Sequence, residues 1–169
     1  MLSDLSLPVI LSSRTGAVQV RRAVPDDLPG LMALLSDDPI SAARGDRGDD
    51  SDGEAYAAAL RCVLDAPLND LLVVDDAAGR LVGTLQLTVI PGMARRGATR
   101  LLVEGVRVSS AERSSGIGTA VMRWVMHVAA PATGATLVQL TSDAARVDAH
   151  RFYTRLGFVD SHVGFKYAV

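Results

Sequence analysis

The sequence has little cysteine and little histidine, with one cysteine and three histidines among 169 residues. A single thiol, Cys62, excludes a disulfide within the chain and any site built from several cysteines. The sequence holds neither an HxxxH nor a CxxC pair, so no zinc ligand set is visible and we expect no metal. This cysteine usage fits a reducing compartment and predicts a cytoplasmic protein.

Long apolar runs are also missing, and neither sign of charge dominates. No run approaches the roughly 20 apolar residues needed to cross a bilayer. The first ten residues carry Asp4 and no cluster of positive charge, which is unlike a signal peptide. The net charge of −2 reflects 17 basic and 19 acidic residues. We therefore expect neither a membrane nor a nucleic acid as partner.

The chain does contain enough apolar residues for one globular domain, because 49% of its residues are hydrophobic and 21% are charged. Hydropathy periodicity predicts the order β α α β β β α β α β, a mixed α/β layer. Residues 1–17 show no clear period and are predicted to form an N-terminal arm, with the domain over 18–169. The expected strands cover 18–21, 71–74, 81–90, 100–108, 135–140 and one or two stretches of 158–169. The expected helices cover 28–35, 54–64, 117–130 and 149–156.

Two local signals accompany these elements. Asp26 or Asp27 is expected to cap the first helix, and Gly157 lies where a helix end favours positive φ. The stretch 36–53 is rich in aspartate and glycine. It fits a solvated, mobile loop, or a substrate lid whose acidic groups attract a cationic amine.

The most informative segment runs from Arg113 to Gly118, between a predicted strand and the most periodic helix. Gly116 and Gly118 let the backbone approach a ligand without a Cβ in the way. The first amides of a helix lack intrahelical partners, and the helix dipole adds positive potential there. These features favour a pyrophosphate site to which Arg113 adds charge, although a tight turn between strand and helix is the alternative. The spacing matches neither a P-loop nor a dinucleotide fingerprint.

Over roughly residues 18–169 the sequence resembles the GNAT superfamily of acyl-CoA-dependent N-acetyltransferases. The family signature, Arg or Gln followed by x-x-Gly-x-Gly or Ala, stands here at 113–118. The family's aromatic-Tyr pair before Leu-Gly-Phe stands at 152–158, and its apolar strand before the signature at 101–108. Ser114 departs from the glycine that many members carry. The resemblance implies a mostly antiparallel sheet with helices on both faces.

The resemblance also implies how the co-substrate, acetyl-CoA, is held. The signature would bind the CoA pyrophosphate through Arg113 and backbone amides of Ser114, Ser115, Gly116, Ile117, Gly118 and Thr119. Val106 and Val108 would pair with the pantetheine arm like an added strand. The N–H of Val106 could polarise the thioester carbonyl, a contact worth about 3 kcal/mol in acyl transfer.

Two residues are candidates for proton transfer. Glu104 interrupts an apolar strand, is in phase with Val106 and Val108 if the strand is regular, and could act as the base. It could equally be a strand-edge carboxylate paired with Arg100 or Arg107. By its place in the family motif, Tyr153 is the candidate acid at the departing sulfur, with a structural role in the core as the alternative.

The resemblance, together with these candidate residues, implies transfer of an acetyl group from acetyl-CoA to the primary amine of a small molecule, in a direct ternary complex. Two other functions stay open, a non-catalytic acyl-CoA-binding or sensing module and a protein N-acetyltransferase. Whether the protein is a homodimer also stays open.

Overall fold

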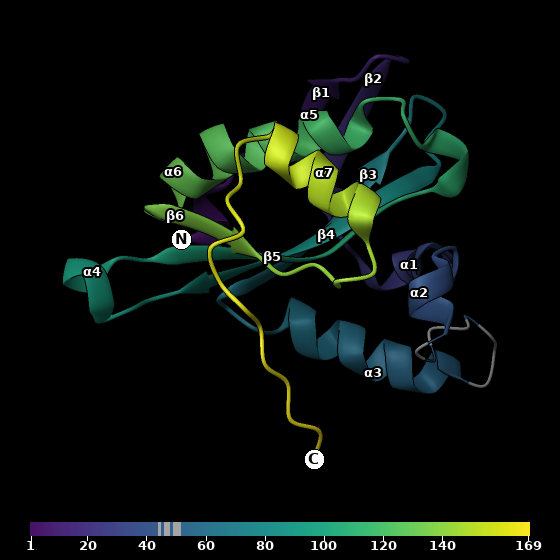
Figure 1. Cartoon of the computed structure of the whole chain (residues 1–169). Coiled ribbons are helices and arrows are strands. Elements are labelled where there is room, and N and C mark those ends of the chain that lie inside the picture. The colour runs from purple at the N-terminus through teal and green to yellow at the C-terminus, as the bar shows by residue number, and fades with distance from the viewer. Residues whose placement is uncertain (44, 46–47, 49–51) are drawn as a thin grey trace. The chain divides into compact units, whose positions relative to one another are not determined.

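The computed structural model describes residues 1–43, 45, 48 and 52–169, in two compact units of residues 1–139 and 140–169 (Figure 1). The first unit is built on a sheet whose strands follow one another in sequence order. The strands are β1 Val9–Ser12, β2 Ala17–Arg22, β3 Asn69–Asp75, β4 Leu81–Ile90, β5 Arg100–Val108 and β6 Leu137–Leu140. Much of the acidic loop predicted to be mobile or a lid lies outside the described residues.

Neighbouring strands from β1 to β5 run antiparallel. Strand β6 starts level with β5, because Thr136 N–H donates to Thr99 O at 3.0 Å and Arg100 Nη1 donates to Gln139 Oε1 at 3.0 Å. The two strands therefore run in the same direction, joined by the helical segment between them. The predicted mixed α/β fold with a mostly antiparallel sheet is confirmed.

Helices pack on both faces of this sheet (Figure 1). On one face, α1 Leu28–Ser36 and α3 Gly53–Leu64 bury Leu31 and Leu60 against Val73 of β3. Side chains alternate along a strand, so Leu72 and Val74 face the opposite layer, where α5 Ile117–Trp124 lies. The loop between β5 and α5 lies at the end of the sheet where β5 finishes.

The remaining helical segments are short, apart from α7. They are η1 Leu2–Asp4, η2 Pro25–Asp27, α2 Pro39–Ala42, α4 Ala94–Gly97, η4 Ser110–Glu112, the π-helical turn η5 Val125–Ala129, α6 Ala130–Ala132 and α7 Val147–Arg155. The helix predicted for 117–130 thus runs on through η5 and α6. Its π turn ends at Ala129, two residues before Pro131, which has no N–H to donate to the helical ladder. None of the helices described here has the length and apolar character needed to span a membrane.

The N-terminal residues join the sheet as its edge strand, β1, and bury Leu2 and Leu5. No periodic signal predicted this strand, because Val9, Ile10 and Leu11 are apolar on both of its faces. The register pairs Val9 with Val20 and Ser12 with Ala17.

The prediction of strands over 158–169 is wrong, because no strand forms there. The apolar and polar residues do alternate, but Val163, Phe165 and Tyr167 are 80%, 93% and 91% exposed. A strand requires a neighbour to pair with. Among its described residues, the second unit offers only Leu140, the last residue of β6.

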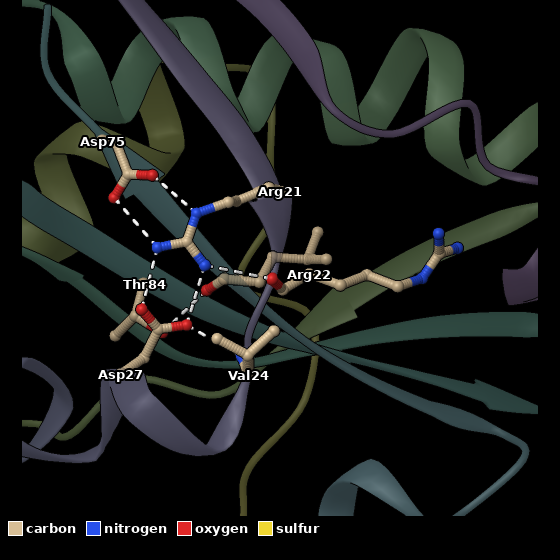
Figure 2. Close-up of polar contacts among 7 residues, drawn as sticks. Arg21, Arg22, Val24, Asp27, Asp75 and Thr84 are labelled. Atoms are coloured by element: carbon tan, nitrogen blue, oxygen red, sulfur yellow. Dashed lines mark hydrogen bonds and ion pairs between the residues drawn. The ribbon is translucent and has the colours of Figure 1, made fainter. Parts of the chain in front are cut away.

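Neither Asp26 nor Asp27 caps α1 with its side chain, so that prediction is also wrong. Asp27 instead accepts hydrogen bonds from the Val24 N–H at 2.8 Å and from Arg21 Nη1 and Nη2, each at 2.8 Å. Arg21 Nε donates to Asp75 Oδ2 at 2.6 Å (Figure 2). The guanidinium therefore joins β2, η2 and β3, and a sequence pattern does not reveal such a pairing.

Candidate functional site

The loop between β5 and α5, residues 109–116, carries the predicted phosphate cradle. Ser109 N–H continues the sheet by donating to Val82 O at 2.9 Å. After η4, Ser114 and Gly116 adopt left-handed φ values of 65° and 90°. These two residues turn the chain so that α5 starts immediately, at Ile117. A glycine at 116 is needed because L side chains rarely adopt this φ.

The cradle separates residues that face solvent from residues that hold the loop together. Arg113 and Ser114 are exposed, and Gly116, Gly118 and Thr119 are half-buried. Within the described chain, the N–H groups of Gly116, Gly118 and Thr119 donate to no other residue. The start of α5 thus presents backbone donors with the polarity that an anion requires.

Ser115, predicted as a ligand contact, has its polar groups directed into the loop. It is 5% exposed, and its N–H donates to Glu112 O at 3.2 Å. Its hydroxyl donates to the same carbonyl at 2.6 Å. Ile117 is also buried. Ser115 and Ile117 therefore shape the cradle, and the accessible donors belong to their neighbours.

Two charged residues hold this loop from other elements. Asp37, at the end of α1, accepts hydrogen bonds from the Ser110 N–H at 2.6 Å and from the Ser110 hydroxyl at 2.9 Å. These bonds, the backbone one first, and the nearby Arg113 charge hold the pKa of the Asp37 carboxyl below its usual range. Arg80 lies in the turn between β3 and β4, and its Nη2 is 3.8 Å from Glu112 Oε1. The loop is thus fixed at both ends of η4.

Strand β5 has an irregularity at the residues predicted to contact the thioester. The register pairs Gln86 with Glu104 and Thr84 with Arg107, so two residues of β5 face one of β4. This is a β-bulge, and Gly105 within it has φ 59°. The bulge leaves Gly105 and Val106 without a partner in the β4–β5 register.

The bulge changes which face Glu104 occupies. Opposed residues point to the same face, so Glu104 shares a face with Arg107. Val108, opposite Gly83, lies on the other face. The expectation that Glu104 is in phase with Val106 and Val108 required a regular strand, and β5 is not regular. A one-residue insertion shifts the alternation, and the sequence signals it only through Gly105.

Glu104 lies on the side of the sheet covered by α1 and α3, and its side chain is exposed. No residue described in the structure forms an ion pair with it. Arg100 Nη1 contacts Gln139, whereas Arg107 Nη2 donates to the buried Ser41 Oγ at 2.7 Å. The pairing of Glu104 with either arginine, which the sequence left open, is therefore not observed.

Tyr153 belongs to the second unit, whereas Glu104, Val106 and the cradle belong to the first. It is half-buried in α7, and its ring meets Phe152 and Phe158 edge to face at centroid distances of 5.1 and 5.8 Å. Gly157 adopts φ 94° as predicted, and the turn brings Phe158 N–H to Tyr153 O at 3.1 Å. The motif thus folds into an aromatic cluster at the end of α7.

The sequence patterns missed two residues that contact this loop, Asp37 and Arg14. Arg14 lies at the tip of the β1–β2 hairpin, and its N–H donates to Ser115 O at 2.8 Å. The only available signal was the turn-forming sequence Ser-Ser-Arg-Thr-Gly between two apolar stretches. By contrast, a shallow hollow of about 320 Å³ beside β2 and the β3–β4 turn includes none of the predicted site residues.

Comparisons with known proteins agree with this fold. The profile of the Acetyltransferase (GNAT) family matches residues 29–158. A crystal structure of a transcriptional regulator from Bacillus halodurans C-125 is 36% identical, with a TM-score of 0.83, covering 90% of this chain and 99% of that one. A comparison with curated proteins finds no match.

Two more distant structures share the fold. An acetyltransferase from Trypanosoma brucei is 22% identical, with a TM-score of 0.70 over 90% of this chain and 99% of that one. Glucosamine-6-phosphate N-acetyltransferase from Arabidopsis thaliana is 16% identical, with a TM-score of 0.70 over 89% and 97%. The residues matched by the family profile include the cradle, the β5 bulge and the motif around Tyr153.

Proposed function

The chain belongs to the GNAT family of acetyltransferases, and from this membership we propose that it transfers the acetyl group of acetyl-CoA to the primary amine of a small molecule. The observation that carries the proposal is the cradle. Its unpaired N–H groups at the start of α5 lie at the family's signature, beside a bulged strand. An acyl-CoA needs both features, an anion site for its pyrophosphate and a strand edge for its amide-containing arm.

The cradle binds the pyrophosphate through the N–H groups of Gly116, Gly118 and Thr119, and Arg113 adds a side-chain charge. The pantetheine arm runs along β5 toward the bulge, pairing with backbone groups of Val106 and Val108. Because the register gives Val106 no partner in β4, its N–H is the natural donor to the thioester carbonyl. Such a donor stabilises the oxyanion by about 3 kcal/mol.

The amine nitrogen attacks the thioester carbon, and the carbon–sulfur bond breaks as the tetrahedral intermediate collapses. Aliphatic ammonium groups have a pKa of about 10, so a base is useful at neutral pH. Glu104, exposed on the α1 and α3 side of the sheet, takes the ammonium proton directly or through a water molecule. Tyr153 gives a proton to the departing thiolate of CoA, and its phenolate then takes the second proton that the acetylated nitrogen loses.

Cys62 takes no part in these reaction steps, because it is exposed on α3 and the reaction requires no acyl-enzyme. The acyl group passes directly from sulfur to nitrogen in a ternary complex. Initial-rate kinetics with both substrates varied should therefore give intersecting lines, whereas a covalent intermediate would give parallel ones.

The test is consumption of acetyl-CoA thioester with a panel of small primary amines and a panel of peptides. We expect turnover with at least one small amine, and no binding of CoA by Gly118→Val, whose branched side chain fills the phosphate path. Turnover with peptides alone would contradict the small-molecule acceptor. Unchanged CoA affinity in Gly118→Val would remove the cradle from the site.

A second function is a non-catalytic acyl-CoA sensor. It is favoured by the description of the 36% identical Bacillus halodurans protein as a transcriptional regulator. The same cradle would then report acyl-CoA without consuming it. Tight CoA binding with no thioester consumption across both acceptor panels would select this function over acetyl transfer.

A further inference from the structure

The β1–β2 hairpin places an arginine from outside the matched family region on the cradle. The turn at its tip is closed by hydrogen bonds from the Ser13 N–H and hydroxyl to Gly16 O, at 2.8 and 2.7 Å. Thr15 N–H adds a longer bond of 3.3 Å to Ser13 Oγ. Arg14 therefore lies in a turn that is held by several hydrogen bonds.

The Arg14 side chain crosses the cradle directly over Gly116. A Cβ added to Gly116 would lie 3.2 Å from Arg14 Cγ and 3.3 Å from Arg14 Nε. The backbone of Arg14 is fixed to the same loop by its 2.8 Å bond to Ser115 O. The guanidinium stem thus occupies the space that the absence of a side chain at Gly116 leaves open.

Arg14 adds positive charge to a region that is already positive. The positive end of the α5 dipole and the cationic Arg113 lie in the same loop region, so a third positive group there is unfavourable by itself. No carboxylate among the described residues pairs with the exposed Arg14 side chain. A bound phosphate group would reverse the balance, because a guanidinium forms charge-assisted hydrogen bonds to phosphate oxygens.

We propose that Arg14 is a phosphate-binding residue of the acyl-CoA site, contacting the pyrophosphate from the side opposite the α5 amides. The inference rests on the proposed function, since it needs acyl-CoA as the ligand. It adds the N-terminal hairpin to a site that the family signature confines to the β5–α5 loop. The pyrophosphate is assigned, and not the 3′-phosphate, because Arg14 lies over Gly116, one of the unpaired cradle donors.

The experiment is calorimetric titration of CoA and of dephospho-CoA, which lacks the 3′-phosphate, into the full chain and its variants. Arg14→Ala removes the side chain and keeps the N–H bond to Ser115. We expect it to weaken binding of both ligands by the same factor, roughly tenfold, since charge-assisted bonds are stronger than neutral ones. Arg14→Lys should recover part of this loss, because it restores the charge without the planar fork.

The matched control is Arg123→Ala, which removes an equal charge from an exposed position on α5. It should change CoA affinity by less than twofold, and the thermal midpoint of Arg14→Ala should match that of the parent. Three outcomes would overturn the proposal: parent-like CoA binding by Arg14→Ala, an equal loss in the control, or a loss confined to CoA with dephospho-CoA unaffected. If the parent itself fails to bind CoA, the proposed function fails instead.

Discussion

Asp37 and Ser110 are 73 residues apart in the sequence, yet they share two hydrogen bonds that join the end of α1 to the cradle loop. One bond comes from the backbone of Ser110, so it positions the chain and not only a side chain. The positive charge of Arg113 also helps to lower the pKa of this carboxyl group. The helical layer that precedes the acidic loop is therefore coupled to the loop that carries the phosphate cradle.

Asp37→Asn should weaken CoA binding by roughly threefold, because it keeps the shape and weakens the hydrogen bonds at Ser110. The folded-state pKa of Asp37 lies below its ordinary value of 3.8, owing first to the Ser110 N–H. The contribution to stability is therefore present above that value and is lost as pH falls through the folded-state pKa. Thermal midpoints of parent and variant should differ at neutral pH and converge in acid. Equal thermal midpoints at neutral pH would show that the Asp37–Ser110 hydrogen bonds do not stabilise the fold.

Ser114→Gly should stabilise the protein by about 0.5–1 kcal/mol. A non-glycine residue at positive φ costs roughly 1–2 kcal/mol, and the greater freedom of glycine in the unfolded chain offsets part of that gain. The matched control is Ser109→Gly in the same loop, where φ is −46° and the same change should destabilise. Urea unfolding of both variants measures the difference, and a loss of stability in Ser114→Gly would show that its hydroxyl matters more than its φ.

Arg21→Met should destabilise the fold by about 3 kcal/mol, because it leaves Asp27 and Asp75 facing each other without their shared cation. The Arg21 hydrogen bonds, aided by the Val24 N–H, lower the pKa of Asp27. The stabilisation is therefore present above the ordinary value of 3.8 and lost as pH falls. Chemical unfolding at several pH values should show the variant's deficit shrinking in acid. A deficit independent of pH would point to lost packing alone.

The sequence predicted the elements that alternate clearly, such as β5 over 100–108 and the helix starting at Ile117, because periodicity reports burial directly. It predicted the tight turn before α5, because closely spaced glycines before a helix indicate backbone with positive φ; the phosphate-binding role of this loop stays a prediction. It could not locate Arg14 or Asp37, whose roles depend on contacts between residues far apart in the chain. It also could not place the β5 bulge, since Leu101–Val108 looks like an unbroken strand, nor the unpaired tail, since alternation predicts a strand without showing whether a partner exists.

Glu104→Gln tests the base at the bulge. It keeps the size of the side chain and removes the proton acceptor, so kcat/KM at neutral pH should fall about 100-fold. The loss should shrink at high pH, where more of the amine is already neutral. Glu54→Gln, at an exposed position of α3, is the control and should keep the parent profile. A Glu104→Gln profile parallel to that of the parent at every pH would assign Glu104 to structure.

Tyr153→Phe tests the proposed proton donor to sulfur. The substitution keeps the ring that meets Phe152 and Phe158 edge to face, so the thermal midpoint should change little. A thiol has a pKa of about 8.5, so an unassisted thiolate still leaves, and the reaction should slow without stopping. We expect kcat to fall at least about tenfold with CoA affinity nearly unchanged, the pattern of a group that acts in the transition state.

The solvent-exposed Tyr167 supplies the matched control for this change, because Tyr167→Phe removes an equal hydroxyl from a side chain that is 91% exposed. Its kcat should equal that of the parent. The dependence on the leaving group separates the two roles of Tyr153 further. If Tyr153 protonates sulfur, an acyl donor with a more acidic thiol should lose less rate in Tyr153→Phe than acetyl-CoA does, since its thiolate needs less assistance. If both donors lose the same factor, the hydroxyl acts on something other than the departing sulfur, and the acid must be water or the acceptor itself.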